Sequence, residues 1–448
     1  MISRNIKKIL CIRPDMIGDV ILITPALLLL RKNFPQAQID IWAQAYTKPL
    51  LENLPEIDNV LVNPSLDFIR SQKYDMSIDF FGELPYALAC FRAGIPLRLG
   101  DKEKIPSRFF YNKAVSLKMN DLTKHKVEHN IDLLKDILSI NYQSPLKLEV
   151  SKKGQIFLSN FLKQQQIKEN DLVIGIHLGT GKGNKAWLPE RFAETIDYLT
   201  EKLKAKVVIT GSKKEKLAAD TVIEKCCFKP INLVEKTSLE ELIGIFSRLN
   251  VYIGVDTGPM HLAAALKRSI VALFPSKFVK PTQWGPWHTQ HIIIRKKIHC
   301  AKKCLPKDCL LDDCLKEITV KDIVTSVENI LQNKANNTIE EAKKDWFKKS
   351  ANILTNSEAI QKELSKDGYF SYLLKSIPSL KEMINLIIKE DINIIHWIGK
   401  IPLKLNIARI ISALSNLFPA LLISNKNVEP ETKPIVTYLK AFSERNHL

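Results

Sequence analysis

Three short polar motifs, each directly after an apolar segment, hold the residues of this sequence that could do chemistry. The first ends in Gly18 and Asp19, where the glycine permits a tight turn and the carboxylate follows at the expected start of a helix. As a helix N-cap, Asp19 would contribute about 1 kcal/mol to stability and nothing to chemistry. As a carboxylate in a cleft, it could accept a proton from a hydroxyl group. In isolation the motif favours the N-cap, and the general base gains weight if the other two motifs face it.

The second motif is a loop rich in glycine and lysine, Gly179-Thr180-Gly181-Lys182-Gly183-Asn184-Lys185-Ala186-Trp187. The glycines would let backbone N–H groups approach an anion, while Thr180 adds a hydroxyl and Lys185 a positive charge. The loop is not a Walker A motif, which needs Gly-Lys-Ser/Thr, and it contains no G-x-G-x-x-G dinucleotide fingerprint. A solvated, hairpin-like loop and a phosphate-binding loop both remain open on these residues.

The third motif lies in Asn250–Ser276, a stretch that alternates strand, loop, helix and strand. Its loop contains, in order, Asp256-Thr257-Gly258-Pro259-Met260-His261. Thr257 and the N–H groups around Gly258 would lie at a helix start, which is a ready site for a diphosphate. Asp256 could orient this loop or bind a sugar hydroxyl. His261 is equally compatible with a buried, hydrogen-bonded histidine and with a group that contacts substrate.

Strand-like and helix-like segments alternate along residues 7–331. One series begins with a strand at Lys7–Arg13 and a second with a strand at Leu172–Leu178. Such alternation is typical of parallel, doubly wound sheets. We therefore expect two Rossmann-like domains, residues 1–160 and 161–333, joined near Ser151–Glu169. Within the first we expect a helix over Val20–Asn33, a polar, basic connection over Gly94–Lys104 and a helix over His125–Leu138.

The composition is that of a globular protein with a strongly positive net charge. The chain has 448 residues, of which 45% are hydrophobic and 25% charged, and its net charge is +18. A lysine-rich coding bias would explain this charge, and so would attraction to anionic lipid, phosphorylated sugars or nucleic acid. No basic arm with interleaved aromatic residues is present, so nucleic acid is the partner we expect least.

The N-terminal stretch could be mistaken for a signal peptide. Arg13, Asp15 and Asp19 interrupt its apolar run, and no small-residue cleavage site follows. The run Val20–Leu30 is too short to span a bilayer. We expect a cytoplasmic protein without a transmembrane helix.

Four of the eight cysteines form a cluster in the sequence: Cys300, Cys304, Cys309 and Cys314. Their spacing lacks the paired C-x2-C knuckles of common zinc ribbons. A structural metal site is therefore one interpretation, and a packing or redox-labile cluster is the one we prefer.

Residues 334–448 lack the alternating pattern and are predicted to form a helical extension of unknown role, broken at Pro378, Pro402, Pro419 and Pro430. The most apolar part is Asp391–Ile423. It could form an interfacial helix, with Trp397, Lys404 and Arg409 at the membrane edge. A small helical subdomain packed on the core is the interpretation we favour.

Together these motifs resemble the ADP-heptose–lipopolysaccharide heptosyltransferases, a family of inverting glycosyltransferases. The resemblance covers about Lys7 to Leu331 and rests on several ordered motifs. They are Gly18-Asp19-Val20 with Thr24-Pro25-Ala26-Leu27, Lys185-Ala186-Trp187-Leu188-Pro189, Gly211-Ser212, Lys236-Thr237-Ser238-Leu239, Gly254-Val255-Asp256-Thr257-Gly258-Pro259-Met260-His261 and Trp284-Gly285-Pro286. Arg13-Pro14-Asp15 departs from the small or hydroxyl residues of many members, so the acceptor is left open.

The resemblance implies a GT-B architecture in which the first domain binds the acceptor and the second the nucleotide sugar across a cleft. Asp19 would then be the general base. Lys185, Thr180 and Gly181 would stabilise the departing ADP diphosphate, and the pocket would be completed by Thr257, Gly258 and His261. Positive charge and helix N–H groups would replace a metal, in keeping with the lack of an Asp-x-Asp motif near this loop, so we expect neither a metal nor another cofactor.

We therefore expect transfer of a heptose from ADP-heptose to the lipopolysaccharide core or a related lipid-linked glycan. The reaction would take place at the cytoplasmic face of the inner membrane, with peripheral contact to anionic lipid. The alternatives are a nucleotide-sugar epimerase or dehydrogenase on paired Rossmann domains, which the missing G-x-G-x-x-G disfavours, and a non-catalytic membrane-associated scaffold. A decayed scaffold would have lost its cleft residues, whereas Asp19, Lys185 and Asp256 are all present.

Overall fold

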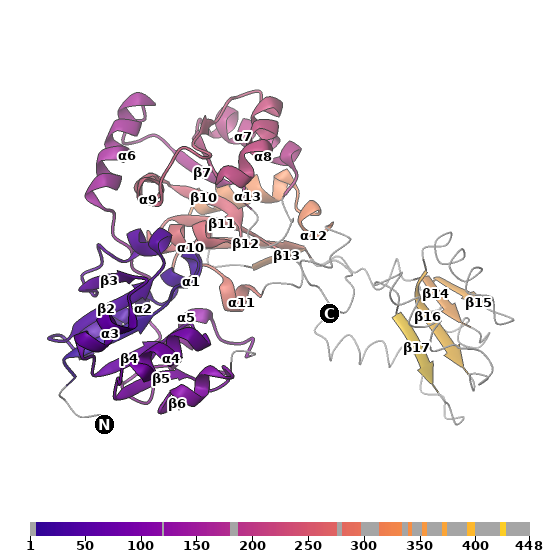
Figure 1. Ribbon diagram of the computed structural model, residues 1–448. Helices are drawn as coiled ribbons and strands as arrows, with labels where there is room; N and C mark the ends of the chain where they lie inside the picture. The colour runs from indigo at the N-terminus through magenta and orange to yellow at the C-terminus, as the bar shows by residue number, and fades with distance from the viewer. Residues whose placement is uncertain are drawn as a thin grey trace. The chain divides into compact units, whose positions relative to one another are not determined.

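The computed structural model describes residues 6–118, 121–179, 187–275, 280–296 and 313–333, together with the backbone of five strands beyond them. The chain divides into two units (Figure 1). One comprises Met1–Lys296 with Asp312–Glu341, and the other Lys297–Leu311 with Ala342–Leu448. Each unit is described by itself below.

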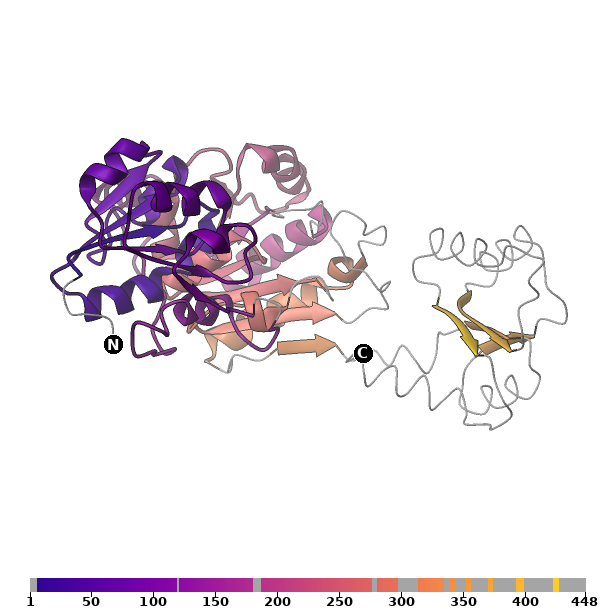
Figure 2. The ribbon, with the colours of Figure 1, turned by 60° about the horizontal axis from the view of Figure 1, so that its bottom comes forward.

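The first unit begins with a six-stranded parallel sheet in the order β3-β2-β1-β4-β5-β6. Its strands are β1 (Lys8–Ile12), β2 (Gln38–Ala43), β3 (Asn59–Val62), β4 (Met76–Asp79), β5 (Leu97–Asp101) and β6 (Lys113–Val115). Helices cover the sheet (Figure 2): α1 (Ile17–Ile21), α2 (Thr24–Asn33), η1 (Ala45–Leu50), α3 (Leu66–Gln72), α4 (Leu84–Arg92), η2 (Ser107–Phe110) and α5 (Lys126–Asp132). The predicted doubly wound sheet is confirmed.

A second sheet in the same unit has the order β13-β12-β11-β10-β7-β8-β9. Its strands are β7 (Val173–His177), β8 (Lys206–Thr210), β9 (Ile231–Asn232), β10 (Val251–Val255), β11 (Ser269–Phe274), β12 (His291–Lys296) and β13 (Ile339–Ala342). Its helices are α6 (Lys152–Gln164), α7 (Pro189–Leu203), η3 (Lys213–Glu215), α8 (Lys216–Lys225), α9 (Leu239–Arg248), α10 (Gly258–Ala265), α11 (Pro281–Trp284), α12 (Asp313–Lys316) and α13 (Val320–Leu331). Two Rossmann-like folds in tandem are therefore present, as expected.

The helix expected over Val20–Asn33 is two helices, α1 and α2, which meet at Leu22 and Ile23. Pro25 causes the break because it has no N–H to offer the preceding turn. The hydroxyl of Thr24 donates to the carbonyl of Ile21 at 2.7 Å and replaces part of the lost pairing. Because of the break, α1 is a separate short helix whose axis is not fixed by the direction of α2.

The connection expected over Gly94–Lys104 contains a strand, β5, so that expectation is wrong. Arg98 and Gly100 concealed it in the sequence because neither is typical of a strand interior. In the structure Arg98 Nε donates to the carbonyl of Phe110 at 2.7 Å, and Gly100 lies against the ring of Tyr111. Each atypical residue therefore has a specific partner beside the strand.

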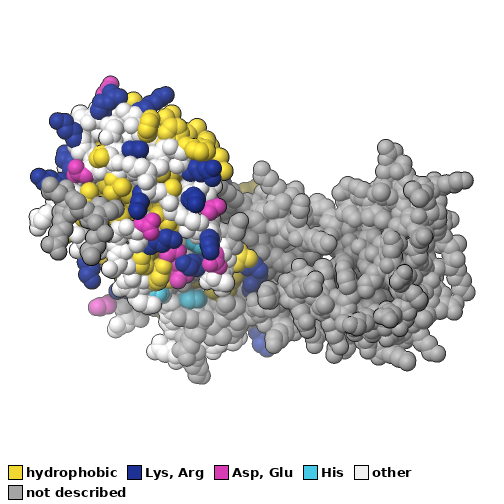
Figure 3. All heavy atoms as spheres, turned by 90° about the horizontal axis from the view of Figure 1, so that it is seen from below, with side chains coloured by type: hydrophobic (Ala, Val, Ile, Leu, Met, Phe, Trp, Pro, Cys, Tyr) yellow, Lys and Arg dark blue, Asp and Glu magenta, His cyan; other side chains and the backbone are white. Residues whose placement is uncertain are grey.

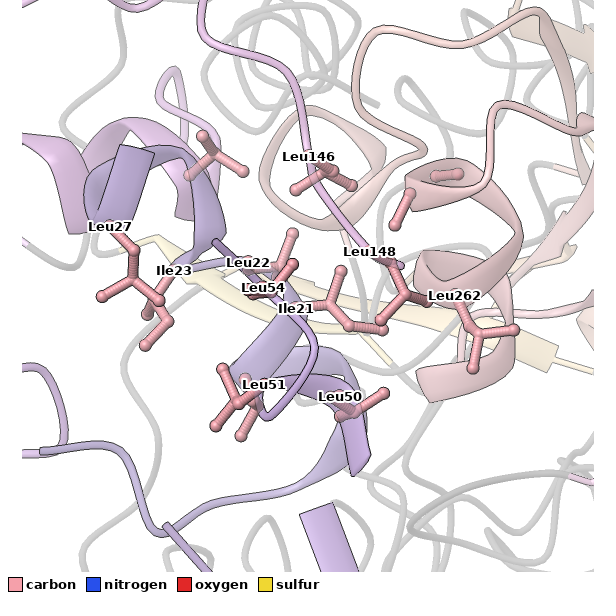
Figure 4. Packing of buried hydrophobic residues seen from close by; sticks show 14 of the residues in the cluster. Ile21, Leu22, Ile23, Leu27, Leu50, Leu51, Leu54, Leu146, Leu148 and Leu262 are labelled. Atoms are coloured by element: carbon pink, nitrogen blue, oxygen red, sulfur yellow. The ribbon is translucent and has the colours of Figure 1, made fainter. Parts of the chain in front are cut away.

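A single hydrophobic cluster spans both Rossmann-like halves. Figure 4 shows Ile21 of α1 and Leu148 in the same cluster as Leu262 of α10. All three side chains are buried. Because this core is continuous, it holds the start of α1 against the start of α10.

The described part of the tail consists of strands, and the helical extension expected there is wrong over those ranges. A four-stranded parallel sheet has the order β15-β14-β16-β17. Its strands are β14 (Asn352–Thr355), β15 (Phe370–Leu373), β16 (Ile392–Ile398) and β17 (Leu422–Lys426). The isoleucine-rich sequence of β16 explains the outcome, because β-branched residues favour strands.

The interfacial helix that we considered for the tail is likewise wrong where it can be checked, because Trp397 belongs to β16. Lys404 and Arg409 lie outside the described residues. Among the residues that were placed, no helix has both the length and the apolar character needed to cross a membrane.

Candidate active site

Two helix starts, one from each Rossmann-like half, meet at two glycines. A Cβ atom on Gly18 of α1 would lie 2.8 Å from His261 Cδ2 and 3.4 Å from the Cα of Gly258. A Cβ atom on Gly258 of α10 would lie 3.0 Å from Ile17 Cβ and 3.3 Å from the Gly18 nitrogen. Only glycine lets the two backbones approach this closely. The first and third motifs are therefore brought together, as the sequence predicted.

Asp19 lies in the first turn of α1, but it is not the N-cap, because Met16 occupies that position. Its carboxylate Oδ1 lies 2.8 Å from Arg13 Nη2, and the same nitrogen lies 3.1 Å from Asp15 Oδ2. Arg13 also donates through Nη1 to the carbonyl of Phe80, at the end of β4. Helix capping therefore does not account for Asp19. Its side chain is 26% exposed and is held by the Arg13 side chain, which is 12% exposed.

Asp256 follows β10 directly and is the second carboxylate of the site. Burial, together with the negative charge of Asp19, raises its pKa to about 7. The two carboxylates thus act on each other although they come from different halves of the chain. Near neutral pH, Asp256 is divided between its protonated and ionised forms, so it can either donate a hydrogen bond or accept one.

His261 is buried and electrically neutral. Burial, together with the neighbouring His125, lowers the pKa of its imidazole to about 3. Its Nε2 lies 4.0 Å from Asp256 Oδ1, and this contact is not an ion pair because the ring carries no charge. Its Nδ1 is buried and has no hydrogen-bond partner among the described residues. The histidine thus has the burial of the first of the two interpretations but not its complete set of hydrogen bonds.

Thr257 and Gly258 form the junction between β10 and α10. Thr257 occupies the N-cap position, yet its hydroxyl donates back to the carbonyl of Val255 at 3.3 Å and makes no capping bond. The start of α10 therefore follows the carboxyl end of a central parallel strand, where ligands bind in open α/β sheets.

The glycine- and lysine-rich loop is described only at its two ends. Gly179 lies so close to His177 that a Cβ atom would be 2.5 Å from the imidazole Nε2. At the other end Trp187 is buried, and its Nε1 donates to the carbonyl of Ile318 at 2.9 Å. Thr180, Gly181 and Lys185 lie outside the described residues. Gly179 follows the carboxyl end of β7, and the roles of the three residues stay a prediction.

Sequence reasoning missed Lys126, which lies beside the first carboxylate. Burial lowers the pKa of its ammonium group, the charge of Asp19 raises it, and the charges of Arg13 and Lys104 lower it. Its Nζ also lies 5.4 Å from the centre of the Trp284 ring. Trp284 begins the Trp-Gly-Pro motif, so this motif contributes to the first half of the site.

His125 caps α5 and was missed as a contact between the two halves. Its Nδ1 accepts from the Val127 N–H, so Nε2 carries the proton and donates to the carbonyl of Gly285 at 2.9 Å. The ring stacks on Trp287 at 4.7 Å between centroids. The capping box of His125 with Glu128, three residues later, was the signal available in the sequence.

Of the four clustered cysteines, Cys314 lies among the described residues. Cys314 is buried on α12, whereas Cys300, Cys304 and Cys309 lie outside the described residues. Within the part of the chain that the structure describes, no three His, Cys, Asp or Glu side chains are grouped so that they could hold a metal ion.

Comparison with known proteins gives a consistent family. Residues 67–314, more than half of the chain, match Glycosyltransferase family 9 (heptosyltransferase). The chain is 25% identical over 294 residues to the lipopolysaccharide heptosyltransferase 3 of Escherichia coli K12, covering 62% of this chain and 84% of that protein.

Two solved structures share the fold. A glycosyltransferase family 9 protein from Veillonella parvula superposes with a TM-score of 0.64 at 23% identity, covering 73% of this chain and 97% of that one. The E. coli ADP-heptose lipopolysaccharide heptosyltransferase II gives a TM-score of 0.61 at 25% identity, covering 73% and 99%. With two Rossmann-like folds whose helix starts meet at Gly18 and Gly258, the protein has the GT-B architecture; it belongs to glycosyltransferase family 9 and is a glycosyltransferase.

Proposed function

We propose that the protein transfers a heptose from ADP-heptose to a lipopolysaccharide core, or to a related lipid-linked glycan, with inversion at the anomeric carbon. The observation that carries the proposal is the meeting of Gly18 with His261, which brings Asp19 of the first half to Asp256 of the second. The E. coli relatives named above are heptosyltransferases of lipopolysaccharide, and one is named for ADP-heptose.

Asp19 acts as the general base in this proposal. Arg13 holds its carboxylate at 2.8 Å, while a quarter of the side chain remains accessible. An acceptor hydroxyl placed beside it loses its proton to the carboxylate as the oxygen attacks the anomeric carbon. The new C–O bond forms on one face of the sugar while the bond to the diphosphate breaks on the other, so a single displacement inverts the configuration.

The second half of the site receives the leaving group. Thr257 and Gly258 at the start of α10 face the diphosphate, and the helix dipole favours the negative charge that develops there. Lys185, Thr180 and Gly181 supply further stabilisation from the loop that Gly179 and Trp187 anchor. Asp256 binds a hydroxyl of the donor sugar, and the neutral His261 completes the pocket without adding a charge.

Fixed positive groups and backbone N–H groups supply the charge stabilisation in this proposal, so transfer needs neither a divalent metal nor another cofactor. Turnover that persists after exhaustive chelation supports this part, and turnover that is lost and then restored by Mg²⁺ contradicts it. The acceptor is a lipid-linked glycan, and we place the reaction at the cytoplasmic face of the inner membrane, in contact with anionic lipid.

The experiment incubates the full chain with ADP-heptose and a panel of core-truncated lipopolysaccharides. We expect ADP release that requires one particular acceptor, together with a mass increase of one heptose. ADP-glucose and UDP-N-acetylglucosamine serve as donor controls. Absence of both transfer and ADP release across the whole panel would remove the heptosyl assignment.

A further inference from the structure

An exposed apolar surface lies on the first Rossmann-like half, around η2. Ile105 and Phe109 are each 68% exposed, and Phe91 at the end of α4 is 50% exposed. A single exposed apolar residue is ordinary on a protein surface. These three are of interest because α4, which contains Phe91, packs on η2, which contains Phe109 and begins two residues after Ile105. We call them the η2 patch.

The backbone around η2 folds the patch into one compact piece. The N–H of Arg108 donates to the carbonyl of Lys104 at 2.8 Å, and the N–H of Phe109 donates to that of Pro106 at 3.2 Å. Helix α4 packs on η2, with the rings of Phe91 and Phe110 meeting edge to face at 5.5 Å. The three apolar residues therefore lie on segments that pack together and not on separate loops.

Cations border the η2 patch. The Arg108 guanidinium lies 4.9 Å from the Phe109 ring and the Arg98 guanidinium 5.3 Å from the Phe91 ring. Arg92, next to Phe91 in the chain, and Lys102, three residues before Ile105, are exposed. Figure 3 shows hydrophobic side chains together with Lys and Arg side chains on the face seen from below, which is the side of β6 in Figure 1.

The acidic groups of this region do not cancel the positive charge. Asp101 is buried. Glu103 is exposed, and its carboxylate accepts from the Ser116 hydroxyl at 2.7 Å. Glu83 lies at the opposite end of α4 from Phe91. Arg92, Arg98, Lys102 and Arg108 thus outnumber the exposed acids around the patch.

The η2 patch lies next to the first half of the active site. The segment that carries it begins at Asp101, the carboxyl end of β5, and parallel strands place their carboxyl ends at one edge of a sheet. Lys104 joins the two regions, because a Cβ atom on Gly82 would lie 2.7 Å from Lys104 Cγ and the charge of Lys104 also acts on Lys126 beside Asp19. A partner that covers the patch would therefore border the acceptor side.

We propose that the η2 patch is a membrane-docking surface that inserts Ile105 and Phe109 among the lipids of an anionic bilayer while Arg98, Arg108 and Lys102 contact headgroup phosphates. Aromatic and aliphatic side chains ringed by Arg and Lys suit the boundary between acyl chains and headgroups. A protein partner would need a larger apolar area than three side chains provide. The proposal rests on the membrane contact in the proposed function and names the surface that makes it, and it depends neither on the sugar nor on the proton acceptor.

The test is co-sedimentation of the full chain with vesicles of phosphatidylcholine alone or with about 30% phosphatidylglycerol, the lipid that supplies the negative charge. We expect binding to the anionic vesicles, and a loss of about tenfold or more in the double variant Ile105→Ser with Phe109→Ser. The matched control is Ile156→Ser with Leu217→Ser, which removes apolar side chains that are 55% and 80% exposed on the second half. This control should bind as the wild type does.

A second readout keeps the test decisive if the serine variant unfolds. Tryptophan in the variant Phe109→Trp should shift its fluorescence to the blue on addition of anionic vesicles, and tryptophan in Leu217→Trp should not. The proposal would be overturned if the wild-type protein did not bind anionic vesicles, or if both serine double variants lost the same share of vesicle binding. It would also be overturned if the fluorescence of the Phe109→Trp variant did not shift. Transfer to a detergent-dispersed acceptor should survive the serine pair, which separates failure of docking from failure of the proposed function.

Discussion

Arg13 Nη2 lies 2.8 Å from Asp19 Oδ1, so a largely buried cation fixes the carboxylate that we assign to proton transfer. The same guanidinium reaches Asp15 Oδ2 at 3.1 Å and the carbonyl of Phe80 at the end of β4. Arg13 therefore joins the β1–α1 turn to the neighbouring strand. The Arg-Pro-Asp sequence that departs from many family members is thus part of the support for the proposed base.

Asp19→Asn tests the base directly. The amide keeps the size of the side chain but accepts a proton poorly, so we expect kcat to fall by about 10²- to 10⁴-fold. The affinity for ADP, measured by calorimetry, should change by less than about threefold because the donor binds the other half. Asp67→Asn, on an 89% exposed side chain paired with Arg70, is the matched control and should leave both quantities unchanged. Retained turnover in Asp19→Asn would exclude the base.

Arg13 acts on the reaction through Asp19, and its variants should show this. In Arg13→Met the carboxylate loses its fixed position, and we expect kcat to fall by about 10- to 100-fold with little change in the donor KM. Arg13→Lys keeps the charge without the planar fork and should recover only part of the loss. Arg70→Met, which removes an exposed arginine, is the control. An effect on KM alone, or full activity in Arg13→Met, would contradict the positioning role.

Gly18→Ala tests the contact between the two halves. The added methyl group would lie 2.8 Å from His261 Cδ2, so either α1 or His261 must move. We expect weaker ADP binding, by about tenfold, along with a lower Tm. Gly94→Ala separates the two effects, because Gly94 has φ +75° but open space around its Cβ position. That variant should lose stability and bind ADP normally; equal ADP affinities in the two variants would contradict the account.

Asp256 predicts a pH dependence of stability. Its pKa is about 7 in the folded protein and about 4 in an unfolded chain. Between these two pH values the folded state therefore binds more protons than the unfolded state. The stability that Asp256 contributes is fully present below pH ~4 and is lost as pH rises through ~7. Asp256→Asn removes this loss. We therefore expect the difference in Tm, variant minus wild type, to be a few degrees larger at pH ~8 than at pH ~5.5. The same difference at both pH values would contradict the argument that burial raises the pKa of Asp256.

The strands that form the centre of each sheet could be predicted because they are buried on both faces and therefore uniformly apolar, as in Val251–Val255. Strand β5 could not be predicted, because Arg98 and Gly100 are accommodated in a strand only through their contacts with other segments. The β-strands of the tail were missed for a different reason. Short apolar runs do not distinguish strand from helix by periodicity, and prolines near them suggested broken helices.

The site divides in the same way. Gly18, Asp19 and Asp256 could be predicted because each lies within a motif of fixed spacing after a strand. Lys126 and His125 could not, because their contacts with Trp284 and Gly285 join residues about 160 positions apart. Only the folded chain brings these residues to the cleft.

The central claim is heptose transfer with Asp19 as proton acceptor, and one measurement addresses it most directly. The full chain and its Asp19→Asn variant, each in excess over the substrates, are mixed with ADP-heptose and with the acceptor selected from the panel of core-truncated lipopolysaccharides. The product is examined by mass spectrometry and NMR. For the wild type we predict one heptose transferred per ADP released, with the anomeric configuration opposite to that of the donor. For the variant we predict bound donor and product formation slowed by about 10²-fold or more. A retained configuration, or equal product from both proteins, would contradict the account.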